Sequence, residues 1–465
     1  MEFILGIGAL AAMCWAGVIF LRGGLVGGAL LVLLAGTCFG HPFFNVPLGP
    51  FPLTLDRVLL GALAVQCLLL RRWGRVELPR LTSSDYLLAA LLALLVVSAL
   101  THDFRFRKGL PLSQLAFFYM VPAMMYAIMR HATWSERSVQ WLLGSLAAFG
   151  VYLALTAIAE SHQASGLVFP SYIASGAVVE FLGRGRGPLL NPSGNGILLA
   201  LTISATLAWW PWLHWRGKWF VLALMPLVAW GVYSTLTRSA WMGAALSVVV
   251  VGGLSTPRRW RAIVLCGACA IGAIATAASW EHFVAFKRDQ YVSAEETAES
   301  ARLRPILAVV AWHMFLDRPL FGCGYGQYIQ ESPAYLADRT TELPLEKARP
   351  FIQHNAFLSL LTETGLVGMS LLIALLVFWT RSAWRLWRRS ASPLWAQQVG
   401  LLYLGFLAAY LMNAMFQDVS IIPMINMILF FLGGTVTTLE SRLTHSAGPS
   451  QTRLNDVEPE LIGTS

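Results

Sequence analysis

The sequence predicts an all-α, polytopic membrane protein with about twelve transmembrane helices and one large loop outside the membrane. Hydrophobic residues make up 57% of the 465 residues and charged residues only 12%, which is about half the charged fraction of a soluble domain. Long apolar runs such as "LLAALLALLVVSAL" (87–100) exclude the alternating pattern of a β-barrel. In lipid, the backbone polar groups of such runs are satisfied only inside helices.

Apolar segments long enough to cross a bilayer, at roughly 17–25 residues each, follow one another along the chain. The N-terminal run "MEFILGIGALAAMCWAGVIFL" carries neither a basic start nor a small-residue cleavage site, so we interpret it as a membrane helix and not as a signal peptide. The segments at 24–39 and 57–70 are short, and one of them is expected to be re-entrant or fused with a neighbour. The predicted spans lie near 2–21, 24–39, 57–70, 84–100, 111–130, 138–160, 188–210, 219–236, 239–255, 262–280, 356–380, 394–416 and 421–439.

The basic residues between these spans predict the orientation of the bundle. Four clusters are separated from one another by even numbers of crossings, so they fall on one side, and this excess of Lys and Arg predicts a cytoplasmic side. The net charge of +9 is therefore attributed to orientation and to contacts with anionic membrane lipids, and not to nucleic acid. The clusters are Arg71, Arg72, Arg75 and Arg80; Arg216 and Lys218; Arg258, Arg259 and Arg261; and Arg381, Arg385, Arg388 and Arg389.

The same pattern divides the chain into four parts. Residues 1–280 are expected to form transmembrane helices with short loops, 281–353 the large periplasmic loop with short helices, and 354–439 the C-terminal transmembrane helices. The tail at 440–465 is rich in Ser, Thr, Gly and Glu, which predicts a disordered cytoplasmic segment. No internal repeat of the kind found in secondary transporters is visible in the sequence.

Arginines gather on the external side, where the orientation rule predicts few positive charges. Arg184 and Arg186 precede an apolar helix, Arg238 lies between two apolar runs, and Arg302 and Arg304 lie in the large loop. Arginines at helix ends commonly reach for lipid headgroups. Arg238 fits this explanation least, because an arginine near lipid depth costs at least roughly 2.5–3.5 kcal/mol and few loop residues hold it in water. Guanidinium groups bind phosphate oxygens bidentately, so the set predicts a polyanion such as a lipid-linked pyrophosphate.

A histidine stands where the large loop enters the membrane, in "HNAFLSLLTETGLVG" (354–368). In a continuous helix, His354, Gly365 and Gly368 would lie within about 60° of one face, and the glycines would let another helix approach closely. Glu363 would project to the opposite side at the membrane interface, about 13 Å below His354. A single histidine is ordinarily a polar cap or an interfacial anchor. The alternative of a catalytic base gains weight from the arginines on the same side of the membrane.

No metal or other cofactor is expected. The chain contains no Asp-x-Asp pair of the kind that holds a divalent cation on a nucleotide-sugar donor, and its external carboxylates are not spaced as an oxygen cage. The six cysteines are scattered, and "CGAC" (266–269) lacks a matching second pair of ligands, so we interpret these residues as packing residues. Arginines would then supply the positive charge that a metal supplies elsewhere.

Four segments resemble the O-antigen ligase family, in the family's order and at the expected helix junctions. The stretch 354–368 is similar to the family signature of His-Asn, nine residues, Gly, two residues and Gly, and "DRPLFGCGYGQY" (317–328) resembles the segment upstream of it. "RGPLLNPSGNG" (186–196) and "STLTRSAW" (234–241) are similar to the two arginine-bearing segments of the family. Residues 1–180 match in hydropathy only.

The resemblance implies a polyprenol-dependent, GT-C-like glycosyltransferase of lipopolysaccharide biosynthesis. Such an enzyme would move a glycan from undecaprenyl pyrophosphate to lipid A–core oligosaccharide, on the periplasmic face of a bacterial inner membrane. Attack by one activated hydroxyl would invert the anomeric carbon. The alternatives are an O-antigen polymerase or a protein O-glycosyltransferase of the same superfamily and, in another class, a transporter of lipid or lipid-linked oligosaccharide, which needs no base.

These implications give each candidate residue a role. His354 is expected to be the general base, because imidazole exchanges protons near neutral pH. Arg186 and Arg238 are expected to bind the pyrophosphate and to stabilise charge on the leaving group. The remaining assignments are Arg184, Arg302 and Arg304 as further ligands of the same kind, Asn355 to orient the imidazole, and Glu363 to pair with an arginine.

Overall fold

The computed structural model is mostly helical, and within the residues that it describes nine helices are long and apolar enough to span a membrane. This confirms the all-α polytopic class. The total of about twelve spans and the assignment of the large loop to the periplasm stay predictions. Most of the expected span at 262–280, all of 281–293 and the tail beyond 446 lie outside the described residues. The described residues are 2–47, 52–102, 111–176, 178–263, 265–267, 270, 294–337, 343–349, 351 and 353–446.

The N-terminal half of the chain begins with one long helix that joins the two predicted spans at 2–21 and 24–39. This helix, α1, bends at Gly24, whose φ of 57° and ψ of −153° are not helical. A strand pair with two residues in each strand, which the sequence did not predict, joins α1 to α2. The elements are α1 (Glu2–Cys38), β1 (Asn45–Val46), β2 (Leu53–Thr54), α2 (Leu55–Arg72), α3 (Ser83–Thr101), α4 (Pro111–Leu115), the π-turn η1 (Ala116–Met120), α5 (Val121–His131) and α6 (Glu136–Ser161).

The remaining elements form the rest of the bundle and a layer on one of its ends. Short 3₁₀ turns connect several of them: η2 (Ser165–Leu167), η3 (Ser171–Ala174), η4 (Val179–Phe181), η5 (Gly187–Leu189), η6 (Trp210–Trp212), η7 (Ser332–Tyr335), η8 (Leu345–Ala348) and η9 (Val419–Ile421). The α-helices are α7 (Pro192–Trp209), α8 (Trp215–Ser234), α9 (Arg238–Ser255), α12 (Ala294–Asp317), α13 (Tyr328–Glu331), α14 (Ala356–Arg388), α15 (Leu394–Ala414) and α16 (Pro423–Ser446).

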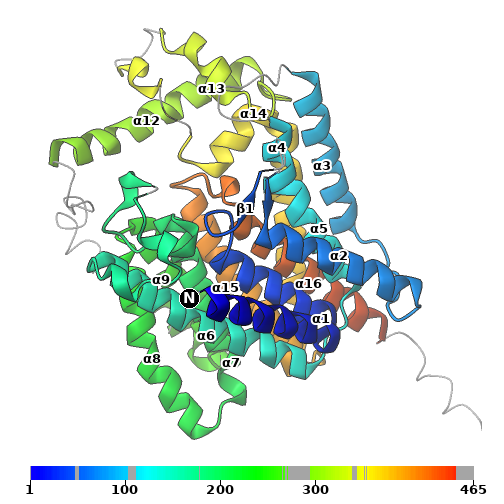
Figure 1. Cartoon of the computed structure of the whole chain (residues 1–465). Helices are drawn as coiled ribbons and strands as arrows, with labels where there is room; N and C mark the ends of the chain where they lie inside the picture. Colours follow the sequence, from blue (N-terminus) through cyan, green and yellow to red (C-terminus); the bar gives the residue numbers. More distant parts are fainter. Residues whose placement is uncertain are drawn as a thin grey trace, which may run out of the picture.

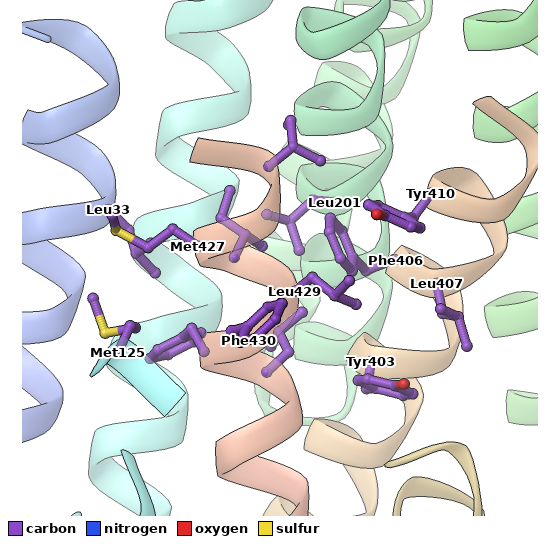
Figure 2. Close-up of a cluster of buried hydrophobic side chains, with 14 of the residues drawn as sticks. Leu33, Met125, Leu201, Tyr403, Phe406, Leu407, Tyr410, Met427, Leu429 and Phe430 are labelled. Carbon is purple, nitrogen blue, oxygen red and sulfur yellow. The ribbon is translucent and has the colours of Figure 1, made fainter. Parts of the chain in front are cut away.

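The last helix lies at the centre of the bundle. Figure 2 shows side chains of α16, including Met427 and Phe430, between α1 and α5 on one side and α7 and α15 on the other. Two adjacent glycines allow this close packing. A Cβ on Gly433 would lie 2.6 Å from the ring of Trp379 on α14, and a Cβ on Gly434 would lie 2.7 Å from a backbone oxygen of α5. Helices that are apolar all round are expected in such buried positions.

A buried ion pair joins three helices at the end of the bundle where α5 finishes. Arg130 of α5 donates from Nε to Asp85 of α3 at 2.9 Å and from Nη1 to Thr438 of α16 at 3.2 Å. The Tyr126 hydroxyl donates to the same carboxylate at 2.8 Å. A bidentate arginine–carboxylate pair whose remaining groups are also hydrogen-bonded is the arrangement in which a buried pair holds its partners in register.

Short connections make successive helices antiparallel, so the bundle has two distinct ends. We call the end where α6 finishes and α9 and α14 begin the loop face, and the end where α2 and α14 finish and α8 begins the basic face. All four basic clusters lie at the basic face or in its connections. Figure 1 shows α12 and α13 lying over one end of the bundle, beside the start of α14. Buried side chains of this layer, among them Val310 and Met314, form a small core of their own.

Candidate functional site

The segment of the first two predicted arginines is anchored at the loop face by a buried ion pair. Arg186 donates from Nε to Glu160 at 3.1 Å, near the end of α6, and Gly187 N donates to the other carboxylate oxygen at 2.7 Å. The Nη2 atom of Arg186 donates to the carbonyl oxygens of Ile173 and Ser175. The Arg186 and Glu160 side chains are only 3% and 4% exposed. In the structure Arg186 therefore holds the chain between α6 and α7 together, and it is not presented to solvent.

The neighbouring arginine links the same segment to the junction between α8 and α9. Arg184 donates from Nη2 to the Thr237 hydroxyl at 2.5 Å and from Nε to the Thr235 carbonyl at 3.3 Å. Gly185 N donates to the Ser234 carbonyl at 2.7 Å. A Cβ on Gly185 would lie 2.7 Å from the Ala157 side chain, so glycine is required for this close approach. The two arginine-bearing segments, about fifty residues apart in sequence, thus lie side by side.

The third arginine opens α9 at this junction. Arg238 is the first residue of the helix, directly after Thr237, and its side chain is half-buried. A cation in the first turn opposes the helix dipole, which costs about 0.3–1 kcal/mol at an exposed site. Helix stability therefore does not explain why an arginine occupies this position. The N-termini of α7, α9 and α14 all lie at the loop face. Asn191 caps α7 and Asn355 caps α14, whereas Thr237 forms no side-chain cap on α9, and the positive end of a helix suits an anion.

His354 precedes α14 instead of lying in it. The helix begins at Ala356, and the Asn355 side chain caps it by accepting from Leu358 N at 2.9 Å. The prediction that His354 shares a helical face with the two downstream glycines is therefore wrong. The backbone around the histidine is fixed from both sides. Gln353 Nε2 donates to the Leu307 carbonyl of α12 at 2.9 Å, and Asn355 Nδ2 donates to the Met415 carbonyl at 3.0 Å. The imidazole is half-buried.

The engagement of Asn355 differs from the predicted role. Its oxygen caps α14 and its nitrogen tethers the end of α15, so in the structure it positions the backbone of His354. Orientation of the imidazole by Asn355 stays a prediction. The same end of α15 also packs against α9, the helix that Arg238 opens. A Cβ on Gly243 of α9 would lie 2.8 Å from Asn413 of α15. The helix that follows Arg238 and the residue that follows His354 thus contact the same end of α15.

Downstream of the histidine, α14 is interrupted where the large loop docks on it. Gly365 has a φ of 64° and a ψ of −164°, and a Cβ there would lie 2.3 Å from the Leu320 carbonyl. The loop carbonyls of Pro319 and Leu320 accept from Leu366 N at 2.8 Å and Val367 N at 3.2 Å. On the other side of the kink, Cys323 N and Gly324 N donate to carbonyls of α14 at 2.9 and 3.0 Å. The first glycine is therefore approached by a loop and not, as predicted, by a helix.

The second glycine of the signature meets a helix as predicted. A Cβ on Gly368 would lie 3.4 Å from the Leu94 side chain of α3, and 2.0 Å from the Thr364 hydroxyl. The glycines of the upstream "GCGYG" also allow a close approach between segments. A Cβ on Gly322 would lie 2.4 Å from the Glu363 carbonyl carbon, and a Cβ on Gly324 would lie 2.6 Å from the His102 ring. Both glycines also have positive φ, so the segment follows a path that other residues rarely adopt.

Glu363 lies in a cavity of about 110 Å³ beside the first turns of α14. Its Oε1 accepts from Tyr328 N at 3.4 Å, and a second carboxylate, Asp418, lines the same cavity from the connection between α15 and α16. Burial raises the pKa of Asp418 above its usual range, and hydrogen bonds from Ser420 and Ser359 oppose this rise. The prediction that Glu363 pairs with an arginine stays untested by these contacts.

The last two predicted ligands lie on α12. Arg304 is on the exposed side of this helix, while the side chain of Arg302 lies outside the described residues. Within the described ranges, no three His, Cys, Asp or Glu side chains come together as a metal site would require. Independence from a divalent metal stays a prediction.

Two acidic residues of the site were missed from the sequence. Glu160 ends the apolar run 138–160, and Asp418 stands alone in the short connection 415–422. An acidic residue at the margin of a membrane span is costly and usually has a partner, which is the signal that could have singled out both.

Comparison with known proteins identifies the segment that holds most of these residues. Residues 223–373, about a third of the chain, match the family model described as O-Antigen ligase. The match includes Arg238, the loop that docks at Gly365 and His354, while Arg184 and Arg186 precede it. No curated protein matches the chain.

Proposed function

We propose that this protein is an inverting glycosyltransferase of lipopolysaccharide biosynthesis, because residues 223–373 match the O-antigen ligase family model. It transfers a glycan from undecaprenyl pyrophosphate to lipid A–core oligosaccharide. The loop face is then the periplasmic face of a bacterial inner membrane and the basic face is cytoplasmic. The collection of all four basic clusters at one end of the bundle supports this orientation.

In the proposed reaction, His354 accepts the proton of an acceptor hydroxyl while the hydroxyl oxygen bonds to the anomeric carbon of the donor glycan. The bond between that carbon and the pyrophosphate oxygen breaks, and the pyrophosphate leaves on its lipid with one additional negative charge. Arg238, with Arg184, Arg302 and Arg304 as further candidates, stabilises this charge as it develops. Attack opposite the leaving group inverts the anomeric carbon.

The observation that carries the proposal is the shared position of Arg238 and His354. Both lie in the matched segment, one opens α9 and the other precedes α14, and both helices meet the same end of α15. A base and a guanidinium at the starts of two helices that both contact α15 would suit a hydroxyl that attacks a phosphate-linked carbon.

Arg186 remains a predicted pyrophosphate ligand, but the structure shows that its guanidinium already has a partner. Its guanidinium is already neutralised by Glu160, so a pyrophosphate here would share it with that carboxylate. The contacts of Arg186 support a positioning role in the site. Its ion pair with Glu160 holds the segment that carries Arg184 against the α8–α9 junction.

The test is incubation of the purified protein with undecaprenyl-pyrophosphate-linked glycan and rough lipopolysaccharide. A larger lipopolysaccharide product is expected. His354→Ala should abolish the product while donor binding survives, and His214→Ala, an exposed histidine at the basic face, should behave like the wild type. Near-normal yield from His354→Ala would remove the base. Extension of the donor glycan alone would indicate a polymerase, and movement of labelled lipid without glycan transfer would indicate a transporter.

A further inference from the structure

The cavity beside the first turns of α14 has no role in the reaction as described so far. Its wall includes Gln353, the residue before His354, together with Ser359 and Glu363. Its opposite wall comes from η1 and from the connection that holds Asp418. A water needs about 10–15 Å³ of such space, so about 110 Å³ holds several waters or one small ring.

The polar groups of this cavity have unused hydrogen-bonding capacity. An ionised carboxylate can accept about four hydrogen bonds, whereas Glu363 has two backbone donors, Gly326 N and Tyr328 N, the latter at 3.4 Å from Oε1. The Tyr328 hydroxyl is buried and forms no hydrogen bond of good geometry, although the Gln353 amide lies beside it. Buried polar groups are normally satisfied, so this arrangement points to a hydroxyl-rich occupant.

The remaining wall is aromatic. The rings of Tyr119 and Tyr325 meet edge to face with centroids 6.0 Å apart, and both residues are buried. A pyranose ring has hydroxyls at its edge and C–H groups on its faces, so it complements carboxylates beside aromatic rings. Small-molecule sites are typically built in this way, from apolar walls with a few convergent polar groups.

The charge of the cavity suits the acceptor sugar better than the pyrophosphate of the donor. None of the described residues that line it is a cation, and two of them are acids, so it disfavours a pyrophosphate. Arg184 and Arg238 lie elsewhere, in the segment 184–187 and at the start of α9, and Arg302 and Arg304 lie on α12. Gln353, which lines the cavity, directly precedes the proposed base His354 in the chain.

We infer that this cavity binds the terminal sugar of the acceptor, as an uncharged pyranose, and thereby presents its hydroxyl to His354. The inference rests on the proposed function for the identity of the acceptor. It adds a selectivity, because Glu363 and Asp418 would repel a sugar that carries a phosphate or a carboxylate.

The experiment measures equilibrium binding to the purified full-length protein in detergent, without turnover. The probes are a core oligosaccharide that ends in a neutral hexose, the same oligosaccharide phosphorylated on that hexose, and undecaprenyl pyrophosphate. Glu363→Gln should weaken binding of the neutral oligosaccharide about tenfold or more, because it removes a charged acceptor. Its affinity for undecaprenyl pyrophosphate should not change. The wild type should bind the phosphorylated oligosaccharide at least about tenfold more weakly than the neutral one, and Glu363→Gln should reduce this difference.

Two further variants keep the test independent of folding. Ile421→Trp enlarges a lining side chain that is 39% exposed, so it should block the cavity without disturbing the core and should weaken only oligosaccharide binding. Glu346→Gln makes the same chemical change at an exposed position of the large loop and should leave all affinities unchanged.

Equal affinity of the wild type and Glu363→Gln for the neutral oligosaccharide would overturn the inference, as would a wild type that binds no oligosaccharide or a loss confined to the donor. The proposed function fails separately. A wild type that binds the oligosaccharide with the expected selectivity but forms no product with both substrates would retain the sugar site and reject the transfer reaction.

Discussion

Replacing Gly365 with alanine tests whether the docking of the large loop on α14 builds the site. The backbone at this position, with φ 64° and ψ −164°, lies in a region that is essentially restricted to glycine, and other residues there cost about 1–3 kcal/mol. An added Cβ would also lie 2.3 Å from the carbonyl carbon and oxygen of Leu320. Backbone atoms cannot yield as a flexible side chain can, so the loop must move away.

Moving the loop breaks the hydrogen bonds from Leu366 N to Pro319 O and from Val367 N to Leu320 O, at 2.8 and 3.2 Å. Each such bond contributes about 0.5–1.5 kcal/mol. With the backbone strain, the total is about 2–6 kcal/mol in favour of the undocked loop. This corresponds to a factor of about 30 or more in the docking equilibrium.

Hydrogen exchange measures this equilibrium at the amides concerned. Peptides that cover 319–324 and 362–367 should exchange faster in Gly365→Ala, and glycan transfer should fall because the same kink sets the first turns of α14 below His354. The matched control is Gly61→Ala, in α2, where a Cβ would meet nothing within 4 Å. Unchanged exchange in both peptides together with full activity of Gly365→Ala would refute the reasoning.

The remaining predictions concern charge. Arg238→Lys should bind the donor about tenfold more weakly than the wild type, since an ammonium cannot replace a bidentate guanidinium; full activity would reduce Arg238 to a generic charge. Arg186→Ala should lower the free energy of unfolding by about 3–5 kcal/mol, because it leaves Glu160 buried without its partner. The double variant with Glu160→Gln should regain thermal stability, and if it also regains donor affinity, Arg186 is no ligand. Burial raises the pKa of Asp418, so the native state binds the proton of this carboxyl more tightly than the unfolded state does. The resulting stabilisation of the native state is present at low pH and is lost as pH rises from about 3.8 through the raised pKa. The unfolding temperature of Asp418→Asn, relative to wild type, should therefore increase as pH rises, and a constant difference would contradict the assignment. Purified protein should keep its initial rate in excess EDTA, whereas inhibition that magnesium reverses would contradict a metal-independent reaction.

The sequence predicted the parts of the site that depend on where apolar runs end. Arg184 and Arg238 were expected at helix junctions on one side of the membrane, and the structure places their junctions in direct hydrogen-bonded contact. The path of the chain between helices could not be predicted from the hydropathy pattern. Hydropathy does not distinguish a glycine that packs against a helix from one with positive φ, so the kink at Gly365 was missed, and with it the error in treating 354–368 as one continuous helix.

The acids of the site show why contacts matter as much as motifs. Glu160 and Arg186 are 26 residues apart, and no spacing rule connects them, yet the ion pair decides how freely that arginine can meet an anion. Asp418 and Glu363 come together because α14 and α15 are antiparallel and the connection after α15 returns to the first turns of α14.

The fold thus separates charge around His354. The guanidinium groups of Arg184 and Arg238 lie at the junction of α8 and α9, while the cavity with two carboxylates lies toward η1 and η9. A reaction that releases a pyrophosphate needs positive charge at the leaving group, but the same charge beside the attacking hydroxyl would oppose proton transfer to a neutral base. Placing the acids on the acceptor side favours an imidazole that becomes positively charged in the transition state. The separation of charge therefore suits direct displacement by a single base.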